Sequence, residues 1–177
     1  MSQLINELNI SVYLVTVNDG DKAAGFVATW ISKASLNDKN HKIVLVISKF
    51  NASTKFLLKS KHFVINQLSE NQMEEFYLFG TSHSDQLDKF QGFTNTTIPQ
   101  GRILSGVAGH ATGEIVSHLE TPDRIILYCS LSEEVTGLGT PMILKEALAK
   151  LSPERKIKLE RKMQHDSMRD EYQFTLA

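Results

Sequence analysis

The chain has 177 residues, of which 41% are apolar and 22% are charged. These proportions are those of an ordinary globular protein, and the length suits one domain with a single substantial core. The formal net charge is −1, which argues against nucleic acid or an anionic membrane surface as the partner, because both attract strongly basic chains.

No run of 18 apolar residues occurs, so we expect no membrane-spanning segment. The first seven residues have no basic start followed by an apolar stretch, which is the pattern of a secretory signal. Cys129 is the only cysteine, and one thiol forms neither an internal disulfide nor a zinc cluster. We therefore expect a cytoplasmic protein.

Residues 11–17 are rich in β-branched and aromatic side chains, and residues 18–21 form a turn signal. A second extended run covers 24–34, so 11–34 is predicted to be a β-hairpin. Residues 43–47 are apolar throughout, as in a strand that is covered on both faces.

The middle of the chain is predicted to contain a short amphipathic helix, further strands and a long loop. Ser53 precedes the helix, in which Phe56 and Leu57 are expected to face inward. The predicted segments are helix 54–60, strand 62–68, helix 71–79, a helical turn with a long loop at 82–101, and strands 109–118 and 124–131 joined by a turn at 121–123.

Two helices are predicted after a break at Gly137 and Gly139. One begins near Pro141 and ends near Lys150, and the next has Ser152 as N-cap and Pro153 at its first position. The second helix, to residue 171, is mostly charged, with a thin apolar line at Ile157, Leu159 and Met163. We therefore predict a mainly β fold, an antiparallel β-barrel with peripheral helices over 1–135, and a helical extension over 136–177 packed on the barrel or on a partner.

Several common fingerprints are absent from the sequence. Residues 106–113 are rich in glycine but lack the Gly-Lys-Ser/Thr of a P-loop, and residues 137–141 lack the third glycine of a dinucleotide fingerprint. The six histidines form no ligand cluster, so we expect no metal site.

The stretch 25–35 places small and hydroxyl residues inside an extended run. Gly25, Ala28, Thr29 and Ser32 would let a flat ligand lie close to the backbone. The alternative is an ordinary barrel strand with a buried Trp30.

The stretch 48–55 combines hydroxyls, an asparagine and two lysines at a predicted helix start. Free N–H groups and the helix dipole favour an anion there, such as a phosphate, although plain N-capping needs only one of these residues. A third stretch, 88–92, is by itself a solvated turn.

Taken in order, these stretches resemble the flavin reductase-like family of FMN-binding split barrels over about residues 8–132. The resemblance implies a Greek-key split barrel that binds FMN. It assigns contacts with the flavin ring and the phosphoribityl chain to Val27, Ala28, Thr29, Trp30 and Ser32. It assigns the phosphate to Ser48, Lys49, Ser53 and Thr54, and places Lys89 near the flavin. It identifies no catalytic residue.

The sequence departs from the family pattern at two points. Residues 38–41 stand where many members have Pro-Pro, and residues 121–124 stand where many have Gly-Asp-His before the last strand. Arg124 therefore replaces a histidine. It either faces the site, where its planar fork could bind the extra phosphate of NADPH, or pairs outward with Asp123 or Glu133.

The resemblance implies an oxidoreductase that passes reducing equivalents from NADH or NADPH through FMN to a free flavin, a partner oxygenase or another acceptor. It also implies a homodimer with the flavin at the subunit boundary. Two alternatives remain, namely a non-catalytic or electron-carrying FMN protein and a split-barrel relative that holds haem or pyridoxal phosphate.

Overall fold

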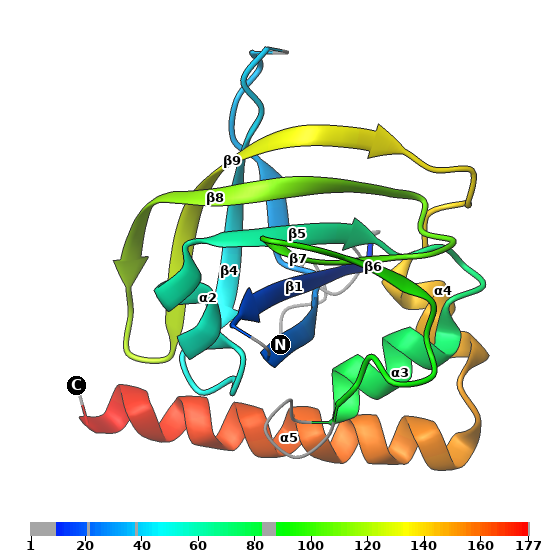
Figure 1. Cartoon of the computed structure of the whole chain (residues 1–177). Coiled ribbons are helices and arrows are strands. Elements are labelled where there is room, and N and C mark those ends of the chain that lie inside the picture. The colour runs from blue at the N-terminus through cyan, green and yellow to red at the C-terminus, as the bar shows by residue number, and fades with distance from the viewer. Residues whose placement is uncertain (1–9, 21, 38, 83–87, 177) are drawn as a thin grey trace.

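The computed structural model describes residues 10–20, 22–37, 39–82 and 88–176. Seven strands form one curled sheet in the order β2-β1-β5-β8-β9-β4-β3, and every neighbouring pair is antiparallel (Figure 1). The strands of this sheet are β1 (Tyr13–Asp19), β2 (Lys22–Ala28), β3 (Ile31–Lys33), β4 (Lys42–Ser48), β5 (His62–Gln67), β8 (Gly109–Glu120) and β9 (Arg124–Thr136).

The chain connectivity forces this sheet to close. β2 and β3 lie at opposite edges, yet only Thr29 and Trp30 separate them in the chain. Seven flat strands would be about 29 Å wide at the usual strand spacing, whereas three residue steps reach at most about 11 Å. The sheet therefore curls until its edges meet. The Val46 N–H donates to the Trp30 carbonyl at 3.0 Å, so pairing with β4 begins just after β2 ends.

Most of the predicted strands and the helix α2 (Thr54–Ser60) are confirmed, but the extended run 24–34 is not continuous. Thr29 and Trp30 leave the sheet between β2 and β3. Trp30 is 53% exposed, so the alternative interpretation, an ordinary strand with a buried tryptophan, is wrong. Phe56 is only partly buried, whereas Leu57 is fully buried as expected.

The long loop predicted at 82–101 contains the first strand of a hairpin that the sequence did not indicate, formed by β6 (Asn95–Ile98) and β7 (Gly101–Leu104). Distant residues hold this hairpin against β1. The Thr16 hydroxyl donates to the Arg102 carbonyl at 2.7 Å, and the Asn18 amide donates to the Ile98 carbonyl at 2.6 Å. Local sequence does not reveal partners about 80 residues away. Residues 83–87 of the predicted loop lie outside the described residues.

Apolar residues form one cluster inside the barrel and another beneath α3 (Met73–Thr81) and α4 (Leu144–Lys150). Phe63, Leu45 and Leu127 are fully buried in the first. Gly113 lies opposite Phe63 in the ladder, and a Cβ on this glycine would lie 2.3 Å from the phenyl ring. The glycine thus leaves room for the ring to fill the barrel.

The helix α4 begins later than expected. Pro141 forms a bridge with Ser69, and the Met142 N–H donates to the Leu68 carbonyl at 2.8 Å. This stretch pairs as an extended segment because Met142 is buried in the second apolar cluster. The helix therefore starts at Leu144 rather than near Pro141.

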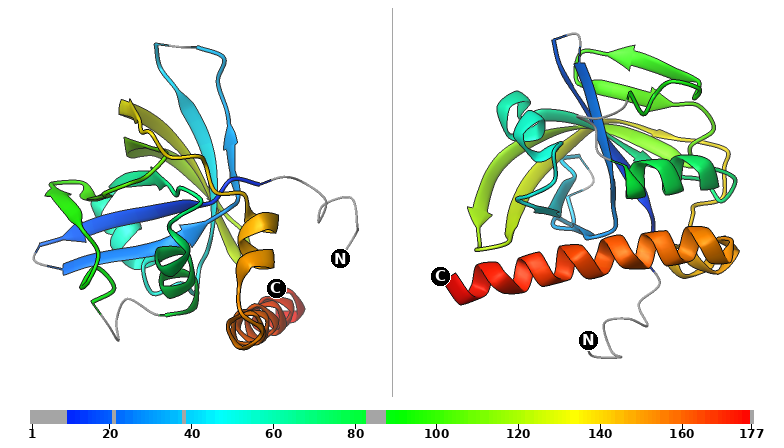
Figure 2. Two further views of the ribbon diagram at one scale, coloured as in Figure 1. Left: turned by 90° about the vertical axis from the view of Figure 1, so that its right-hand side faces the viewer. Right: turned by 90° about the horizontal axis from the view of Figure 1, so that it is seen from below.

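The last helix, α5 (Pro153–Leu176), lies alongside the barrel as one long rod (Figure 1). Figure 2 (left) shows it nearly end-on, below α4 and to one side of the strands. The Ser152 hydroxyl accepts the Arg155 N–H at 3.4 Å, which confirms the predicted cap. The predicted apolar line is wrong in part: Leu159 is buried, but Ile157, two positions away and so on another face, is half exposed.

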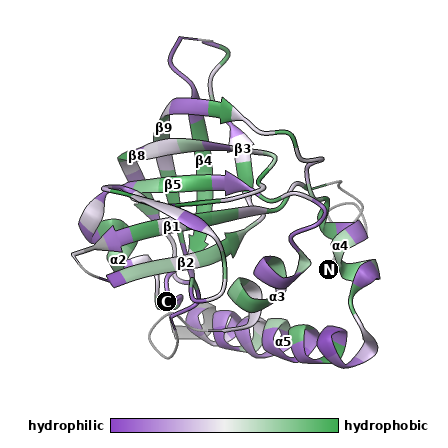
Figure 3. Ribbon diagram, turned by 45° about the vertical axis from the view of Figure 1, so that its right-hand side comes forward, coloured by the Kyte–Doolittle hydropathy of each residue, from purple (hydrophilic) through white to green (hydrophobic). Residues whose placement is uncertain are grey.

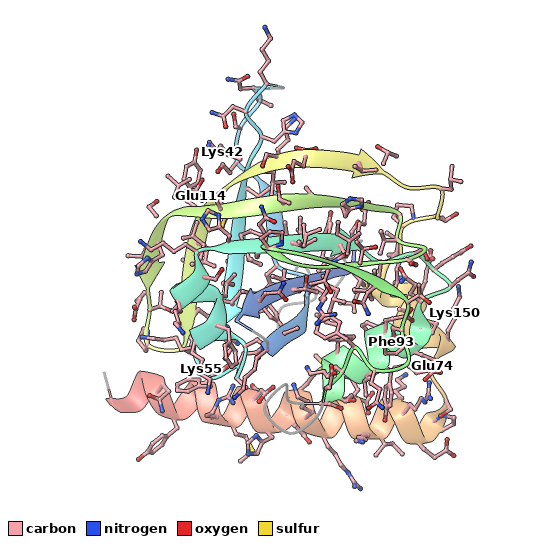
Figure 4. All side chains as sticks on the ribbon, viewed as in Figure 1. Lys42, Lys55, Glu74, Phe93, Glu114 and Lys150 are labelled. Atoms are coloured by element: carbon pink, nitrogen blue, oxygen red, sulfur yellow. The ribbon has the colours of Figure 1, made fainter. Side chains whose placement is uncertain are left out.

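Polar contacts fix the first part of α5. The Arg155 guanidinium donates to both carboxylate oxygens of Glu74 on α3, at 2.6 and 2.9 Å (Figure 4 labels Glu74). Most of α5 is hydrophilic, in contrast to the inner strands of the barrel (Figure 3). Within the described part of the chain, no helix is both long and apolar enough to cross a membrane.

Candidate functional site

A cleft of about 300 Å³ lies where the chain leaves β2, with α5 on its other side. We call it the α5 cleft. The barrel contributes most of its lining and α5 contributes four residues; the lining residues are Phe26, Val27, Ala28, Thr29, Trp30, Val46, Ile47, Ser48, Asn51, Arg124, Lys162, Met163, Asp166 and Arg169.

A smaller cavity of about 60 Å³ adjoins the α5 cleft, and we call it the side pocket. It shares Ser48, Lys162 and Arg169 with the α5 cleft, together with Phe26, Asn51 and Asp166. Lys89 lines the side pocket but not the α5 cleft. The two cavities therefore follow one path beneath α5.

The structure brings only part of the predicted flavin-contacting stretch to the cleft. Residues 27–30 and Ser48 line it. Ser32 lies further along, exposed on β3, where its hydroxyl donates to the Lys33 carbonyl at 3.4 Å. The break between β2 and β3 is what exposes residues 29 and 30 to the cleft.

The residues predicted to hold a phosphate make contacts within the protein. The buried Thr54 hydroxyl donates to the Ser48 carbonyl at 2.7 Å, and the buried Ser53 hydroxyl donates to the Gly25 carbonyl at 3.4 Å. Ser53 makes no side-chain cap of α2. These two hydroxyls thus join the helix start to β2 and β4.

The two predicted lysines differ in their placement. Lys49 Nζ lies 2.8 Å from Glu120 and donates to the Thr121 carbonyl at 3.1 Å. The hydrogen bond from Lys49 to the Glu120 carboxylate is the main cause that lowers the pKa of Glu120. Lys89 is buried behind β2 and donates to the carbonyls of Gly25 at 2.9 Å and Ser82 at 2.7 Å. Of these two lysines, only Lys89 therefore lines a cavity.

Arg124 lies in the cleft and is also ion-paired. Its guanidinium lies 5.1 Å from the ring centroid of Trp30, 2.5 Å from Asp170 and 3.5 Å from Asp123. The two orientations that the sequence left open are thus combined, since Arg124 lines the cleft and pairs with Asp123. Its nearest acidic partner is Asp170 of α5, which the sequence did not indicate.

Sequence reasoning also missed the α5 residues in the cleft. Lys162, Asp166 and Arg169 are spaced four and three positions apart, which places them on one face of a helix. The spacing predicts that these side chains share one face of a helix. A charged helical face is ordinarily solvated, however, and no neighbouring residue in the sequence indicates that this face lines a cavity.

Two other features carry no site chemistry. Cys129 is fully buried, and desolvation raises the pKa of its thiol to about 12, so it is not a nucleophile. Among the residues that the structure describes, no group of His, Cys, Asp or Glu could hold a metal ion.

A separate pocket of about 240 Å³, the barrel-end pocket, lies where β8 begins and β9 ends and includes Tyr13, Ala111 and Leu131.

A curled antiparallel sheet whose edges meet at the break between β2 and β3, with a cleft at that break, defines the class of split β-barrels. The family profile described as "Flavin reductase like domain" matches residues 6–134. The chain therefore belongs to the flavin reductase-like family. Membership supports a flavin as the cofactor.

A protein of Nostoc sp. (strain PCC 7120) named "Putative diflavin flavoprotein A 2" is 29% identical over 135 residues, which are 75% of this chain and 23% of the relative. The chain thus spans about a quarter of the length of the curated relatives it matches.

Solved structures agree on the fold. The NADH:FAD oxidoreductase of Streptomyces globisporus C-1027 superposes with a TM-score of 0.72 at 18% identity, covering 79% of this chain and 83% of that one. A flavin reductase domain protein from Arthrobacter sp. FB24 gives a TM-score of 0.70 at 21% identity, covering 80% and 86%. The predicted split-barrel fold is confirmed.

Proposed function

We propose that the chain binds FMN in the α5 cleft and works as an NAD(P)H-dependent flavin reductase. One observation carries the proposal: residues 27–30 and Ser48, on which the family resemblance places the flavin, line a single cleft in a chain of the flavin reductase-like family. The cleft combines apolar and polar side chains in equal number, and a cofactor site needs both, the first for packing and the second for orientation.

The lining of the cleft suits the chemistry of a flavin. Phe26, Val27 and Val46 offer apolar surface for a flat ring, while Arg124, Lys162 and Arg169 offer cations for its phosphate. The Nε of Arg169 is buried and has no hydrogen-bond partner among the described residues. A buried donor of this kind fits an acceptor supplied by a ligand.

When bound, FMN supplies a ring that accepts a hydride and passes electrons onward. The protein supplies position and charge. Val27 and Ala28 would hold the ring against β2, and Trp30 with Arg124 would form one wall. The buried ammonium of Lys89 lies behind the same strand, where it favours negative charge in the cleft.

The proposed electron donor is NADH or NADPH, and the acceptor is a free flavin, a partner oxygenase or another small molecule. An electron-carrying FMN protein is the second candidate. Arg124 favours it, because this residue stands where the resemblance places a histidine and is held by Asp123 and Asp170. A residue fixed in two ion pairs is less free to receive a nicotinamide.

We also propose a homodimer that closes the cleft. Trp30 lies half exposed at the cleft, and the projecting connection between β3 and β4 carries Leu36, which is 90% exposed (Figure 1). Val116 and Leu119 on β8 are exposed as well. Sedimentation equilibrium should give a dimer, and a stable monomer that holds FMN tightly would contradict this part of the proposal.

The absorption spectrum of the freshly purified chain, with the released cofactor identified, tests the binding of FMN. We expect a yellow protein that releases FMN. A haem or pyridoxal phosphate spectrum would overturn the proposal. Stopped-flow mixing with NADH and NADPH then tests turnover: rapid bleaching of the flavin supports a reductase, and no bleaching with either nucleotide supports the electron carrier.

A further inference from the structure

We propose that α5, which lies outside the matched family domain, supplies the cations that bind the flavin phosphate, through Arg169 and Lys162. This inference rests on the proposed binding of FMN and extends it to residues that the family resemblance does not cover. The family profile ends at residue 134, whereas α5 begins at Pro153.

Lys49, which the resemblance assigns to the phosphate, and Lys89, which it places near the flavin, both have other partners. Lys49 does not line the α5 cleft or the side pocket, and its Nζ contacts Glu120 and the Thr121 carbonyl. Lys89 Nζ donates to two backbone carbonyls, which hold β2 to the end of α3. A phosphate near Ser48 would therefore need further donors.

Arg169 lies at the junction of the two cavities. Its Nη2 lies 3.4 Å from the hydroxyl of Ser48, one of the four residues to which the resemblance assigns the phosphate. The guanidinium also lies 4.6 Å from the ring centroid of Phe50. This contact holds the guanidinium beside the turn that follows β4, where its planar fork suits an oxyanion.

The donors of Arg169 are not all used. Nη1 lies 3.2 Å from Asp166, and Nη2 lies 3.4 Å from Asp170. Nε is buried without a hydrogen-bond partner, one of two such side-chain atoms among the described residues; the other, Arg102 Nε, lies on β7, away from the cleft. A guanidinium has five N–H donors, and a buried one left unmatched is costly. A phosphate oxygen would satisfy it.

Lys162 adds a second cation on the same face of α5. Its Nζ lies 3.5 Å from Asp166, a long contact that leaves other ammonium donors available to the cavities it lines. Asp123, Asp166 and Asp170 offset the charges of Arg124, Lys162 and Arg169. These six charges thus balance one another, so phosphate binding depends on directed hydrogen bonds from the guanidinium of Arg169 and the ammonium of Lys162.

The test compares FMN with riboflavin, which lacks the phosphate, by titration of the full chain freed of bound flavin. We expect Arg169→Gln to weaken FMN by about ten- to a hundredfold, and Lys162→Gln by about three- to tenfold, while riboflavin changes less than about twofold. Arg161→Gln is the matched control, because it removes the same charge from an exposed position of α5, and it should leave both affinities unchanged.

The variant Arg169→Lys distinguishes a loss of hydrogen bonds to the phosphate from a loss of folded α5. It keeps the charge but removes the planar fork, so FMN affinity should lie between wild type and Arg169→Gln. Circular dichroism shows whether α5 is retained in each variant. Equal losses for FMN and riboflavin, or no loss for either, would overturn the role of α5 and leave the proposed function standing. A wild-type chain that binds neither flavin would overturn the proposed function and this inference together.

Discussion

The barrel buries Phe63, Leu45 and Leu127 completely, whereas α5, over 24 residues, buries only Leu159 and Asp170 among its described side chains. The barrel is therefore stabilised mainly by apolar burial, which is large and insensitive to salt. Helix α5 depends on ion pairs with Glu74 and Arg124 at separate points along its length.

The two walls of the α5 cleft are therefore held by different kinds of interaction. The barrel wall of the cleft is fixed by the closure of the sheet, but the α5 wall is held by charged contacts that are individually weak. One wall should thus keep its shape under conditions that release the other. Each of the following predictions tests whether the two regions respond differently.

The largest effect is expected in the barrel. Phe63→Ala should lower the free energy of unfolding by about 3–5 kcal/mol, because it removes a fully buried ring that packs over Gly113. Urea denaturation measures the change. Leu138→Ala, at a fully exposed position between β9 and α4, should cost less than about 0.5 kcal/mol. Similar costs for both variants would mean that this cluster does not dominate stability.

Asp170→Asn should loosen α5 and leave the barrel intact. The substitution keeps the shape of a buried side chain but removes its charge opposite Arg124. We expect trypsin to cleave within α5 about tenfold faster, with little change in barrel unfolding. The neighbouring variant Glu171→Gln, at an exposed position, is the control. In wild type, added salt should speed the same cleavage; salt-independent cleavage would argue against docking by charge.

Arg124→Ala should alter the choice of nicotinamide if the reductase proposal holds. Arg124 lies in the α5 cleft beside Trp30, where its fork could bind the extra phosphate of NADPH. We expect the NADPH-to-NADH ratio of kcat/KM to fall about five- to tenfold. Steady-state kinetics measures it, and an unchanged ratio would leave Arg124 with only its structural contacts.

The smallest effect is expected at Lys49. Its ammonium pairs with the half-exposed Glu120, away from both cavities. Lys49→Ala should therefore weaken FMN by less than about fivefold in a titration. A selective loss of tenfold or more for FMN over riboflavin would return Lys49 to the phosphate site that the sequence motif predicted.

The sequence predicted the strands of the barrel well because alternation, β-branched residues and turn signals are local features. It could not show that Thr29 and Trp30 interrupt the run 24–34, because that break follows from the closure of the sheet. The hairpin of β6 and β7 was missed for a related reason, since Thr16 and Asn18 hold it from far along the chain.

The residues of the candidate site were also predicted only in part. Residues 27–30 and Ser48 were identified by their motifs, and they line the cleft. Motifs do not show which donors are already used, so the contacts of Lys49 with Glu120 and of Thr54 with the Ser48 carbonyl were not foreseen. Nor could a charged helical face reveal that Lys162 and Arg169 lie across from β2 and β4.

Both proposals require that one ligand, FMN, occupies the space between the barrel and α5. Hydrogen exchange of the full chain, measured with and without FMN, tests it most directly. We expect slower exchange on binding in two separate segments, residues 26–31 of the barrel and 162–170 of α5. Protection confined to the barrel segment would remove α5 from the site. Protection instead at 108–111 and 131–136, around the barrel-end pocket, would contradict the placement of the flavin.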